Sequence, residues 1–263
     1  MQEGIYIAAS AGLKQQTKLD IIANNLANVN NAGFKKDGII FKELIPPFEP
    51  DTSFESSRNT LLPADVSNRN VAYVGINEFY TNHSQGNLVQ TGNSLDLGLD
   101  GEGFFAVNTP QGVRYTRNGN FRLDTNEQLV TQEGYPVLGD AGGPVTIPAQ
   151  GGNVTIDAAG TVSVGGGIGI TAIGQIRAVN FENKKDLVKV GADLYRTADP
   201  QIKETPAANV SVRQGFLESS NVNTVEEMTQ MISTLRGFEA YQKVIQSIDA
   251  ADEQSVNNIG RVT

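Results

Sequence analysis

Residues 5–29 read IYIAASAGLKQQTKLDIIANNLANV, and the spacing of apolar residues in this stretch decides the fold of its end of the chain. Eight positions recur at alternating spacings of three and four, and six of them are apolar: Ile5, Ala8, Gly12, Gln15, Leu19, Ile22, Leu26 and Val29. This spacing is typical of a coiled-coil seam. We predict a helix from about Gly4 to Asn31 that ends at Ala32-Gly33, because glycine can adopt the left-handed conformation.

The last two turns of this predicted helix are rich in asparagine. Five of the eight residues from Asn24 to Asn31 are asparagine, which is a poor helix former because its amide competes for backbone hydrogen bonds. Two interpretations stay open. The segment is either a solvated polar face with a frayed end, or an amide ladder between neighbouring helices that fixes their register.

The other end of the chain predicts a second amphipathic helix. Thr224 and Glu227 have the spacing of a capping box, and Met228, Met231, Leu235, Phe238 and Ile245 follow on one helical face. Two narrow apolar stripes at opposite ends are expected to pack on each other and on copies of the chain. The predicted subunit interface comprises Leu19, Ile22, Asn24, Asn25, Leu26, Asn28, Val29, Met228, Met231, Leu235, Phe238 and Ile245.

The middle of the chain divides into a connector and a β domain. Residues 34–83 are irregular, with Pro46-Pro47, Pro50 and Pro63 breaking any helix and Val71 to Ile76 suggesting an isolated strand. Residues 84–216 show short strands separated by turns. The expected strands are Leu95–Leu99, Phe104–Val107, around Tyr115, Phe121–Leu123, Leu129–Thr131, Val145–Ile147, Val154–Ile156 and Ile176–Phe181.

The fold class that follows is α+β, with N- and C-terminal helices pairing into a helical core and a central, mainly antiparallel β domain. The expected parts are 1–33 with 217–263, the connector 34–83, and the β domain 84–216. Two hairpins are predicted inside the β domain, each with an aspartate before its turn, Asp124 and Asp157. We interpret Gly165 to Gly169 as a mobile loop, because no Lys-Ser/Thr pair follows it to hold a phosphate.

Composition excludes several functions. The net charge of −9 and pI of about 4.7 argue against a nucleic-acid binder, which needs clustered basic residues. The chain has no cysteine, which excludes disulfides, thiolate zinc sites and cysteine nucleophiles. No apolar run approaches the ~18 residues needed to insert into a bilayer, and Met1 to Ala11 lacks the features of a secretory signal. If the protein is exported, we expect another route.

No catalytic or cofactor site emerges from the motifs. His83 is the single histidine, which leaves no histidine metal cluster or spare base, and we expect it in a surface loop. A calcium loop at Asp124 is discarded, because leucine occupies the position that needs glycine. Asp100 and Glu102 could be imagined as paired catalytic carboxylates, but alternating Asp and Leu is also typical of a half-buried strand. We expect no enzyme, no cofactor and no metal.

Several motifs together resemble one family. Ala23-Asn24-Asn25-Leu26-Ala27-Asn28, followed by Ala32-Gly33-Phe34-Lys35, is similar to the N-terminal signature of bacterial flagellar rod and hook proteins. The other similar motifs are Ser84-Gln85-Gly86-Asn87-Leu88, Leu95-Asp96-Leu97, Gly101-Glu102-Gly103-Phe104-Phe105, Tyr115-Thr116-Arg117-Asn118-Gly119-Asn120-Phe121 and Leu217-Glu218-Ser219-Ser220-Asn221-Val222-Asn223, the last preceding Glu227-Met228, Met231-Ile232 and Phe238-Glu239. Together they cover most of the chain except the connector.

The resemblance implies a structural subunit of the basal-body rod, the axial drive shaft for motility. Its terminal helices would form the inner tube and its β domain would lie outside. Its partners would be copies of itself, other flagellar axial proteins and the flagellar type III export apparatus. That apparatus would export the chain to the periplasmic rod without a cleaved signal peptide.

Within the family, Gln132 to Gly139, and Ala240 to Gln246 leading to Asn258-Ile259-Gly260-Arg261, resemble the F-type proximal-rod branch. The alternative is the distal-rod branch. A different class of function, a peptidoglycan-acting enzyme or binder that uses Asp100 and Glu102, is the further alternative.

Overall fold

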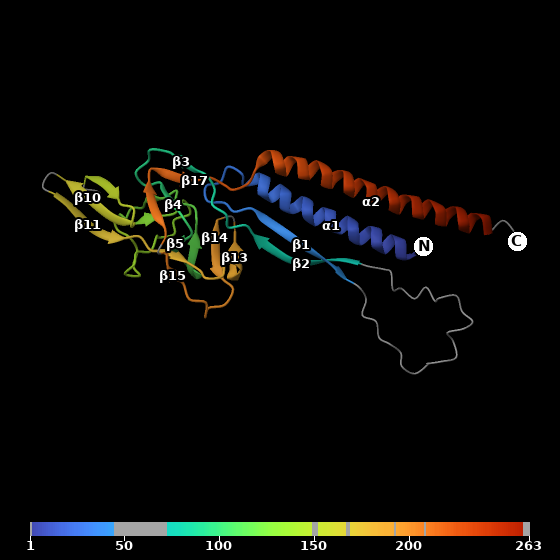
Figure 1. Cartoon of the computed structure of the whole chain (residues 1–263), viewed down its shortest axis with the longest axis horizontal. Coiled ribbons are helices and arrows are strands. Elements are labelled where there is room, and N and C mark those ends of the chain that lie inside the picture. Colours follow the sequence, from blue (N-terminus) through green and yellow to red (C-terminus); the bar gives the residue numbers. More distant parts are fainter. Residues whose placement is uncertain are drawn as a thin grey trace, which may run out of the picture. The chain divides into compact units, whose positions relative to one another are not determined.

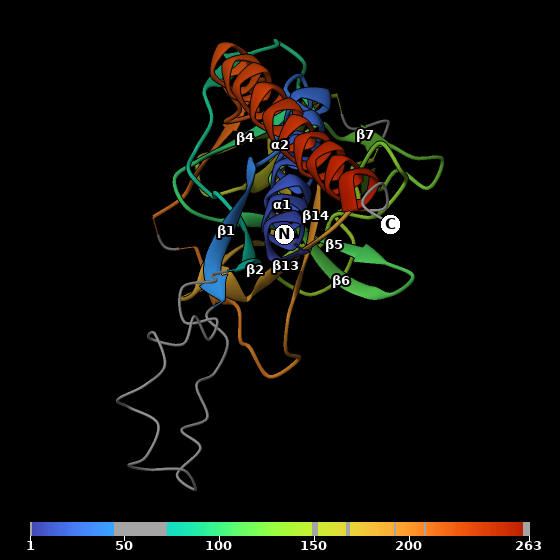
Figure 2. The ribbon, with the colours of Figure 1, turned by 90° about the vertical axis from the view of Figure 1, so that its right-hand side faces the viewer.

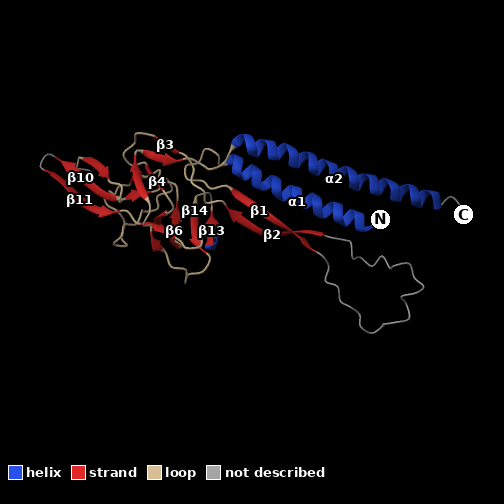
Figure 3. Ribbon diagram, in the orientation of Figure 1, coloured by secondary structure: helices blue, strands red, loops and turns tan. Residues whose placement is uncertain are grey.

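The computed structural model describes residues 2–44, 73–148, 152–166, 169–191, 193–207 and 209–259 (Figure 1). The chain forms two compact units. Unit 1 contains Met1–Asn24, Gly38–Tyr80 and Val225–Thr263, and unit 2 contains Asn25–Asp37 and Thr81–Thr224. The α+β class is confirmed, with one helix near each end and a mainly antiparallel central domain (Figure 3).

Unit 1 is built on two long helices, α1 (Gln2–Ala27) and α2 (Thr224–Ile259). They lie side by side in both views (Figures 1 and 2). A methyl group placed on Gly4 would lie 3.4 Å from Ile248, and one placed on Gly12 would lie 4.0 Å from Phe238. These neighbours run in opposite directions along the two sequences, so the helices are antiparallel. Glycine at these positions of α1 leaves room for the side chains of Ile248 and Phe238 on α2.

The helix α1 ends four residues earlier than its predicted end at Asn31. The backbone N–H of Asn28 donates to Asn25 O at 3.2 Å, and that of Asn31 donates to Asn28 O at 3.1 Å, which are turns of three residues. Asparagine side chains compete for backbone groups, and the side chain of Asn25 binds Asp37 instead. Gly33 adopts the expected left-handed conformation, with a φ of 71°, but it lies six residues beyond the last residue of α1 and does not end the helix.

The predicted start of the second helix is confirmed at Thr224. Acidic residues occupy its first turn, at Glu226 and Glu227, where they complement the positive end of the helix dipole. Within the described part of the chain, neither helix is long and apolar enough to cross a bilayer.

The connector is more regular than predicted. Strands β1 (Asp37–Leu44) and β2 (Tyr73–Thr81) pair into a two-stranded sheet. The strand suggested at Val71 to Ile76 is therefore found, and its described part runs from Tyr73 to Thr81. The pairing was missed because its two halves are far apart in sequence. The predicted breakers Pro46-Pro47, Pro50 and Pro63 lie outside the described residues.

Unit 2 is organised around a six-stranded antiparallel sheet in the order β13-β14-β6-β5-β12-β15. Its strands are β5 (Phe104–Thr109), β6 (Gly112–Thr116), β12 (Ala178–Asn180), β13 (Leu187–Val190), β14 (Leu194–Thr197) and β15 (Thr205–Pro206). A short 3-10 helix, η2 (Lys184–Asp186), precedes β13. The central strand β5 is buried on both faces, so its side chains enter two separate clusters.

Smaller sheets complete the unit. A three-stranded sheet has the order β11-β10-β9, and three pairs of strands are β16-β4, β17-β3 and β7-β8. Their bounds are β3 (Leu88–Gln90), β4 (Leu97–Asp100), β7 (Arg122–Leu123), β8 (Leu129–Val130), β9 (Asn153–Ile156), β10 (Thr161–Gly166), β11 (Gly169–Gln175), β16 (Ser211–Gln214) and β17 (Phe216–Glu218). The predicted strand at Val145–Ile147 is wrong, because there only Thr146 forms an isolated bridge, to Gln128.

Both predicted hairpins are confirmed. Strand β7 pairs with β8, and β9 pairs with β10, each across a turn that begins with an aspartate. The Asp124 carboxylate accepts hydrogen bonds at 2.8 Å from the backbone N–H groups of Asn126 and Gln128. The Asp157 carboxylate does the same with Ala159 and Thr161. The loop predicted from Gly165 to Gly169 is wrong at its ends, because Gly165 and Gly166 belong to β10 and Gly169 belongs to β11, which pair with each other; residues 167–168 lie outside the described residues.

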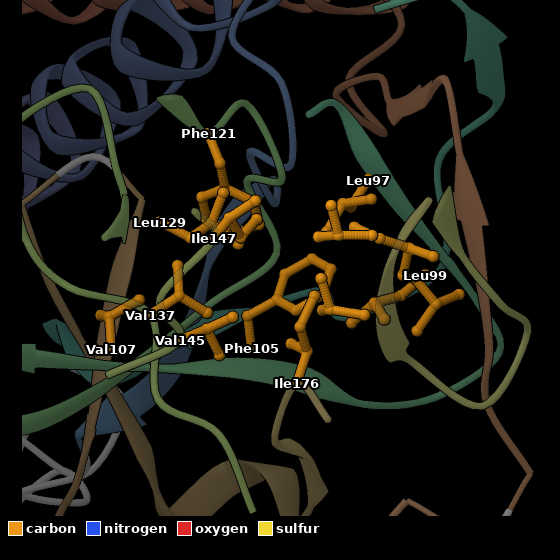
Figure 4. Packing of buried hydrophobic residues seen from close by; sticks show 14 residues of the cluster. Leu97, Leu99, Phe105, Val107, Phe121, Leu129, Val137, Val145, Ile147 and Ile176 are labelled. Carbon is orange, nitrogen blue, oxygen red and sulfur yellow. The ribbon is translucent and has the colours of Figure 1, made fainter. Parts of the chain in front are cut away.

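The main core of unit 2 fills the space between these sheets (Figure 4). Its members are fourteen buried apolar residues: Leu97, Leu99, Phe105, Val107, Phe121, Leu129, Val137, Val145, Ile147, Ile156, Val162, Val164, Ile176 and Val212. A second cluster on the other face of β5 contains Phe104, Ala106, Tyr115, Leu138, Val179, Phe181, Leu187 and Tyr195. The second cluster borders the candidate site.

Candidate functional site

Three charged side chains of unit 2 form a buried charge centre, which consists of Lys35, Arg117 and Glu218. Lys35 Nζ forms an ion pair with Glu218 Oε1, and Arg117 Nη1 lies 3.1 Å from Glu218 Oε2. The Lys35 and Glu218 side chains are fully buried and that of Arg117 is 2% exposed. Charges of this kind are rarely buried unless paired, so the centre is a built feature of the fold.

Backbone groups add further hydrogen bonds to the centre, although Arg117 Nε is buried without a partner among the described residues. The Gly86 N–H donates to Glu218 Oε1 at 2.8 Å, and Lys35 Nζ donates to Ser84 O at 2.8 Å. Arg117 Nη2 donates to Gly101 O at 2.7 Å. The carboxylate is thus bound by two cations and one backbone donor, which is the condition under which a buried ion pair is tolerated.

The charge centre joins segments that lie next to the two long helices in the sequence. Lys35 comes eight residues after the end of α1, and Glu218, the last residue of β17, comes six residues before α2. Gly33 allows the segment after α1 to pass close to the Arg117 backbone, because a Cβ atom at this position would lie only 2.4 Å from it. The segment that follows α1 and the segment that precedes α2 therefore meet in the same buried contact.

Burial dominates the electrostatics of the two cations. It lowers the pKa of Lys35 and of Arg117, while the negative charge of Glu218 opposes both shifts. The Arg117 guanidinium also lies over the Phe104 ring, 5.4 Å from its centroid. Without Glu218 both cations would be buried and unpaired, so this carboxylate holds the centre together.

His83 lies in a loop, as expected, but not on its exposed surface. Its ring is half-buried, with its centroid 5.7 Å from that of Phe104 and 5.4 Å from that of Tyr195. Burial, together with the charges of Lys184 and Lys35, lowers the pKa of His83 to about 4. The histidine is therefore neutral at pH 7. Its aromatic neighbours are distant in sequence, so no local pattern could reveal them.

A second polar contact fixes the segment just after α1. The Asn25 side chain donates to Asp37 O and accepts from Asp37 N, both at 2.9 Å. The Asp37 carboxylate accepts from Thr81 Oγ1 and from Lys189 Nζ, both at 2.8 Å. Lys189 also lies over the Phe34 ring at 3.7 Å. Asn25, which we predicted at a subunit interface, thus makes these bonds within its own chain.

The other predicted interface residues fall on different faces of the helices. On α1, Ile22 is buried and Leu19 and Leu26 are half-buried, as is Val29 just beyond the helix, whereas Asn24 is exposed and Asn28 half-buried. On α2, Met231, Phe238 and Ile245 are half-buried on the same face as the buried Thr234. This inner face lies toward α1, as the approach of Phe238 to Gly12 indicates.

Met228 and Leu235 belong to a second, exposed face of α2. Together with Val225 and Ile232 they recur at spacings of three, four and three, and we call these four residues the outward stripe. Their exposed fractions are 74% for Val225, 49% for Met228, 55% for Ile232 and 42% for Leu235. On α1, Tyr6 and Leu13 are 64% and 65% exposed. Exposed apolar residues in rows mark interaction surfaces.

The carboxylates considered for catalysis are used in ion pairs. Asp100 Oδ2 lies 2.7 Å from Arg213 Nη2, and Glu102 Oε1 lies 2.7 Å from Lys184 Nζ. The described ranges contain no group of three His, Asp or Glu side chains that could hold a metal ion. The Asp124 carboxylate binds its own turn.

Sequence reasoning singled out the motifs that contain the charge centre without finding the centre itself. Lys35, Arg117 and Glu218 each stand in a motif that carried the family resemblance, as do Ser84, Gly86 and Gly101. The only sign of the centre in the sequence was that each of these separate motifs contains a charged residue or a turn residue. Nothing in the sequence indicated that they meet in space.

Three family models match parts of this chain. Residues 5–35 match the family model "Flagella basal body rod protein", residues 98–164 match "Flagellar hook protein FlgE/F/G D1 domain", and residues 213–259 match "Flagellar basal body rod FlgEFG protein C-terminal". The three matches include helix α1, the centre of unit 2 and helix α2.

Curated relatives align over nearly the whole chain. The flagellar basal-body rod protein FlgG of Bacillus subtilis is 36% identical over 98% of this chain and 99% of its own. FlgG of Buchnera aphidicola from Acyrthosiphon pisum is 35% identical over 95% and 96%. FlgF of Caulobacter vibrioides is 32% identical over the full length of both chains, which supports the F-type resemblance. The chain therefore belongs to the family of flagellar basal-body rod proteins, and it is a structural subunit of the rod rather than an enzyme.

Proposed function

We propose that this subunit polymerises through α1 and α2, with copies of itself and with other flagellar axial proteins. The helices would form the inner tube of the rod and the β domain would lie outside it. The supporting observation is the outward stripe, because its four apolar side chains are exposed in the single chain although α2 already has an inner face. Burying a large apolar side chain contributes about 1.5–3 kcal/mol, so a repeated stripe can hold a polymer together.

Under this proposal, the predicted interface residues have different roles. Leu19, Ile22, Met231, Phe238 and Ile245 hold the helix pair within one subunit. Met228 and Leu235 lie on the outward stripe and contact neighbouring subunits. The asparagines Asn24 and Asn28 set the register against neighbours at the end of α1, with Leu26 and Val29 beside them. Asn25 binds the backbone of Asp37 within the same subunit.

The charge centre supports a mechanical role. A subunit of a rotating shaft has to pass force between its helices and its β domain without the connecting segments slipping. The segments that lead to both helices are held by fully buried, multiply bonded ion pairs. We infer that the centre keeps these segments fixed under torque.

The test is assembly of a purified variant. Ile232→Asp places a charge in the outward stripe, and Ser233→Asp places the same charge beside it on an exposed polar position of α2. We expect Ile232→Asp to stay folded by circular dichroism and to be lost from rods, while Ser233→Asp is incorporated normally. Normal rods containing Ile232→Asp would contradict the proposal.

The position along the rod and the route of export are also part of the proposal. We assign the subunit to the proximal rod, following the F-type resemblance, with the distal rod as the alternative. Export would proceed through the flagellar type III apparatus to the periplasmic rod, without a cleaved signal peptide. Imaging of isolated basal bodies with this subunit labelled would decide its order along the axis, and its N-terminal sequence in rods would reveal any cleavage.

A further inference from the structure

Strand β11 is an open edge of the three-stranded sheet β11-β10-β9. It pairs with β10 on one side, and among the described residues no strand pairs with its other side (Figure 1). Proteins usually block such edges with a charge or a proline, because an open edge can pair with a strand of another chain. The outer strands of the six-stranded sheet carry Lys189 and Pro206. Strand β11, with the sequence GITAIGQ, contains neither kind of residue.

The opposite edge of the same sheet, strand β9, is covered by a glutamine side chain. Gln214 Oε1 accepts from the Ile156 N–H at 3.1 Å, and Gln214 Nε2 donates to Val154 O at 2.9 Å. The glutamine therefore takes the place of a neighbouring strand. On β11, within the part of the chain that the structure describes, the only backbone group bonded outside the sheet is Gln175 O, which accepts from the Asp140 N–H at 3.0 Å. One edge is covered and the other is open.

The register of the sheet identifies the open backbone groups of β11. The N–H and C=O of Thr161 in β10 bind the turn between β9 and β10, so they point away from β11. Backbone direction alternates along an antiparallel strand, so the groups of Ser163 and Gly165 point away from β11 too. Their partners across the register are Ala172 and Ile170. The N–H and C=O groups of these two residues therefore point away from β10, into the open edge.

The side chains along this edge suit contact with another copy of the chain. Ile170 is 79% exposed, and Thr171 and Ala172 are also exposed. Residues 141–175 contain one charged residue, Asp157, although the whole chain has a net charge of −9. Two copies with the same net charge repel each other, and this repulsion is weakest where the surface is uncharged.

We propose that two copies of this chain pair through β11, antiparallel and centred on Thr171. In this register Ile170 of one copy lies opposite Ala172 of the other, and the two residues exchange their backbone hydrogen bonds. The open groups of both residues are thereby satisfied in both copies. The exposed Ile170 side chain packs beside Ala172 of the second copy, whose single methyl group leaves room for it. The two three-stranded sheets become one continuous sheet.

This interface differs in kind from the proposed helical polymer. Both copies use the same strand, so the contact is isologous and pairing stops at a dimer. Polymerisation along an axis needs contacts that repeat, and its proposed residues lie on α1 and α2. One short strand per copy is a small contact, so the dimer belongs to the weak, transient class and forms at high protein concentration.

The test is oxidative cross-linking of full-length chains, which contain no natural cysteine. Every chain also carries Ile232→Asp, so that contacts through the outward stripe do not contribute. In the proposed register the two residues at position 171 form a non-hydrogen-bonded pair with Cα atoms about 4.5 Å apart, which a disulfide can span. We expect Thr171→Cys to form disulfide dimers at least tenfold faster than Thr125→Cys, which places its thiol in the exposed β7–β8 turn.

A mixture of two variants tests the register. Chains with Ile170→Cys and isotope-labelled chains with Ala172→Cys are oxidised together, and the dimers are weighed by mass spectrometry. Because position 170 lies opposite position 172, the mixed dimer should form at least tenfold faster than either homodimer. Equal rates for the mixed dimer and the homodimers would contradict the proposed register.

A charge on the edge strand supplies the matched control. Ile170→Lys, added to Thr171→Cys, should slow cross-linking at least tenfold, because two lysines then approach each other across the pair. Asn153→Lys places the same charge at an exposed position of β9, the covered edge, and should leave the rate unchanged. Both positions are exposed, so both variants should keep the circular dichroism spectrum of the parent chain.

The proposal is overturned if Thr171→Cys cross-links no faster than Thr125→Cys, or if Ile170→Lys and Asn153→Lys have equal effects. Because every chain in the experiment carries Ile232→Asp, neither outcome bears on polymerisation through the helices.

Discussion

At the scale of single residues, the fold depends on buried charges that share one counter-ion. Glu218 forms ion pairs with both Lys35 and Arg117, so it ties together the two segments that lead to the helices. Removing one partner of a buried ion pair is costly because the remaining charge stays in the interior. The charge centre should therefore behave differently from ion pairs at the surface.

Glu218→Gln should lower the free energy of unfolding of unit 2 by about 3–5 kcal/mol, because it leaves two buried cations without a counter-charge. The matched control is Glu102→Gln, which makes the same change in an ion pair whose carboxylate is 72% exposed. That control should cost less than about 1 kcal/mol. Urea unfolding followed by circular dichroism measures both, and equal effects would contradict a structural role for the centre.

His83 predicts a pH dependence in a range where few other groups titrate. In the unfolded chain it binds a proton near pH 6.5, but in the folded chain only near pH 4. Between these values the unfolded state binds more protons, so stability is complete above pH 6.5 and falls toward pH 4, by up to about 3 kcal/mol.

Unfolding in urea at pH 5.0 and 6.5 tests this expectation. The chain has one histidine, so His83→Gln should remove most of the difference between the two pH values. A difference that is unchanged in His83→Gln would mean that other groups cause it.

At the scale of elements, sequence patterns predicted what is local. The three- and four-residue spacing found α1, the capping box found the start of α2, and Asp124 and Asp157 found two hairpins, because each signal lies within one turn of its effect. The end of α1 was placed four residues too late, and the contact that marks it is distant in sequence: the side chain of Asn25, in the last turn of the helix, binds Asp37, twelve residues away. The pairing of β1 with β2 was not predicted for the same reason, because the two strands are even farther apart in sequence.

Gly33 lies in unit 2, between α1 and the charge centre, and gives a prediction with an internal control. Gly33→Ala and Gly142→Ala both place a side chain at a positive φ, of 71° and 82°. Each should cost about 1–2 kcal/mol for the left-handed backbone. Gly33→Ala should cost a further 1–3 kcal/mol, because its Cβ would meet the Arg117 backbone while that of Gly142 meets nothing within 4 Å.

Thermal unfolding of the two variants, measured side by side, checks this difference. If the two variants are equally stable, the segment around Gly33 can shift without a loss of stability, and it does not fix the chain at the charge centre.

At the scale of the whole molecule, the sequence predicted two helices near the ends and a β domain between them. The structure differs from this prediction in the boundaries of the compact units. The compact unit that contains the β domain runs from Thr81 to Thr224 and also includes Asn25–Asp37, which we had divided between the helix and the connector. Lys35 and Asn25 bind that segment into unit 2, and such long-range contacts leave no periodic trace in a sequence.

The outward stripe could be predicted only in part. Met228 and Leu235 were expected at a subunit interface, yet the same pattern grouped them with Met231, Phe238 and Ile245, which face α1. A single apolar stripe in the sequence became two faces in the structure, because α2 has apolar residues on both sides. The two faces of α2 can be distinguished only when the position of α1 is known.

Labelling of single-cysteine variants tests the proposed polymer interface most directly, because the natural chain has no cysteine. Ile232→Cys places a thiol in the outward stripe, and Thr125→Cys places one in the exposed β7–β8 turn. In the monomer both should react with a maleimide at similar rates. In isolated rods we predict that Cys at position 232 is protected at least tenfold while Cys at position 125 still reacts. Equal labelling of position 232 in monomers and rods would contradict the claim that the subunit polymerises through its helices.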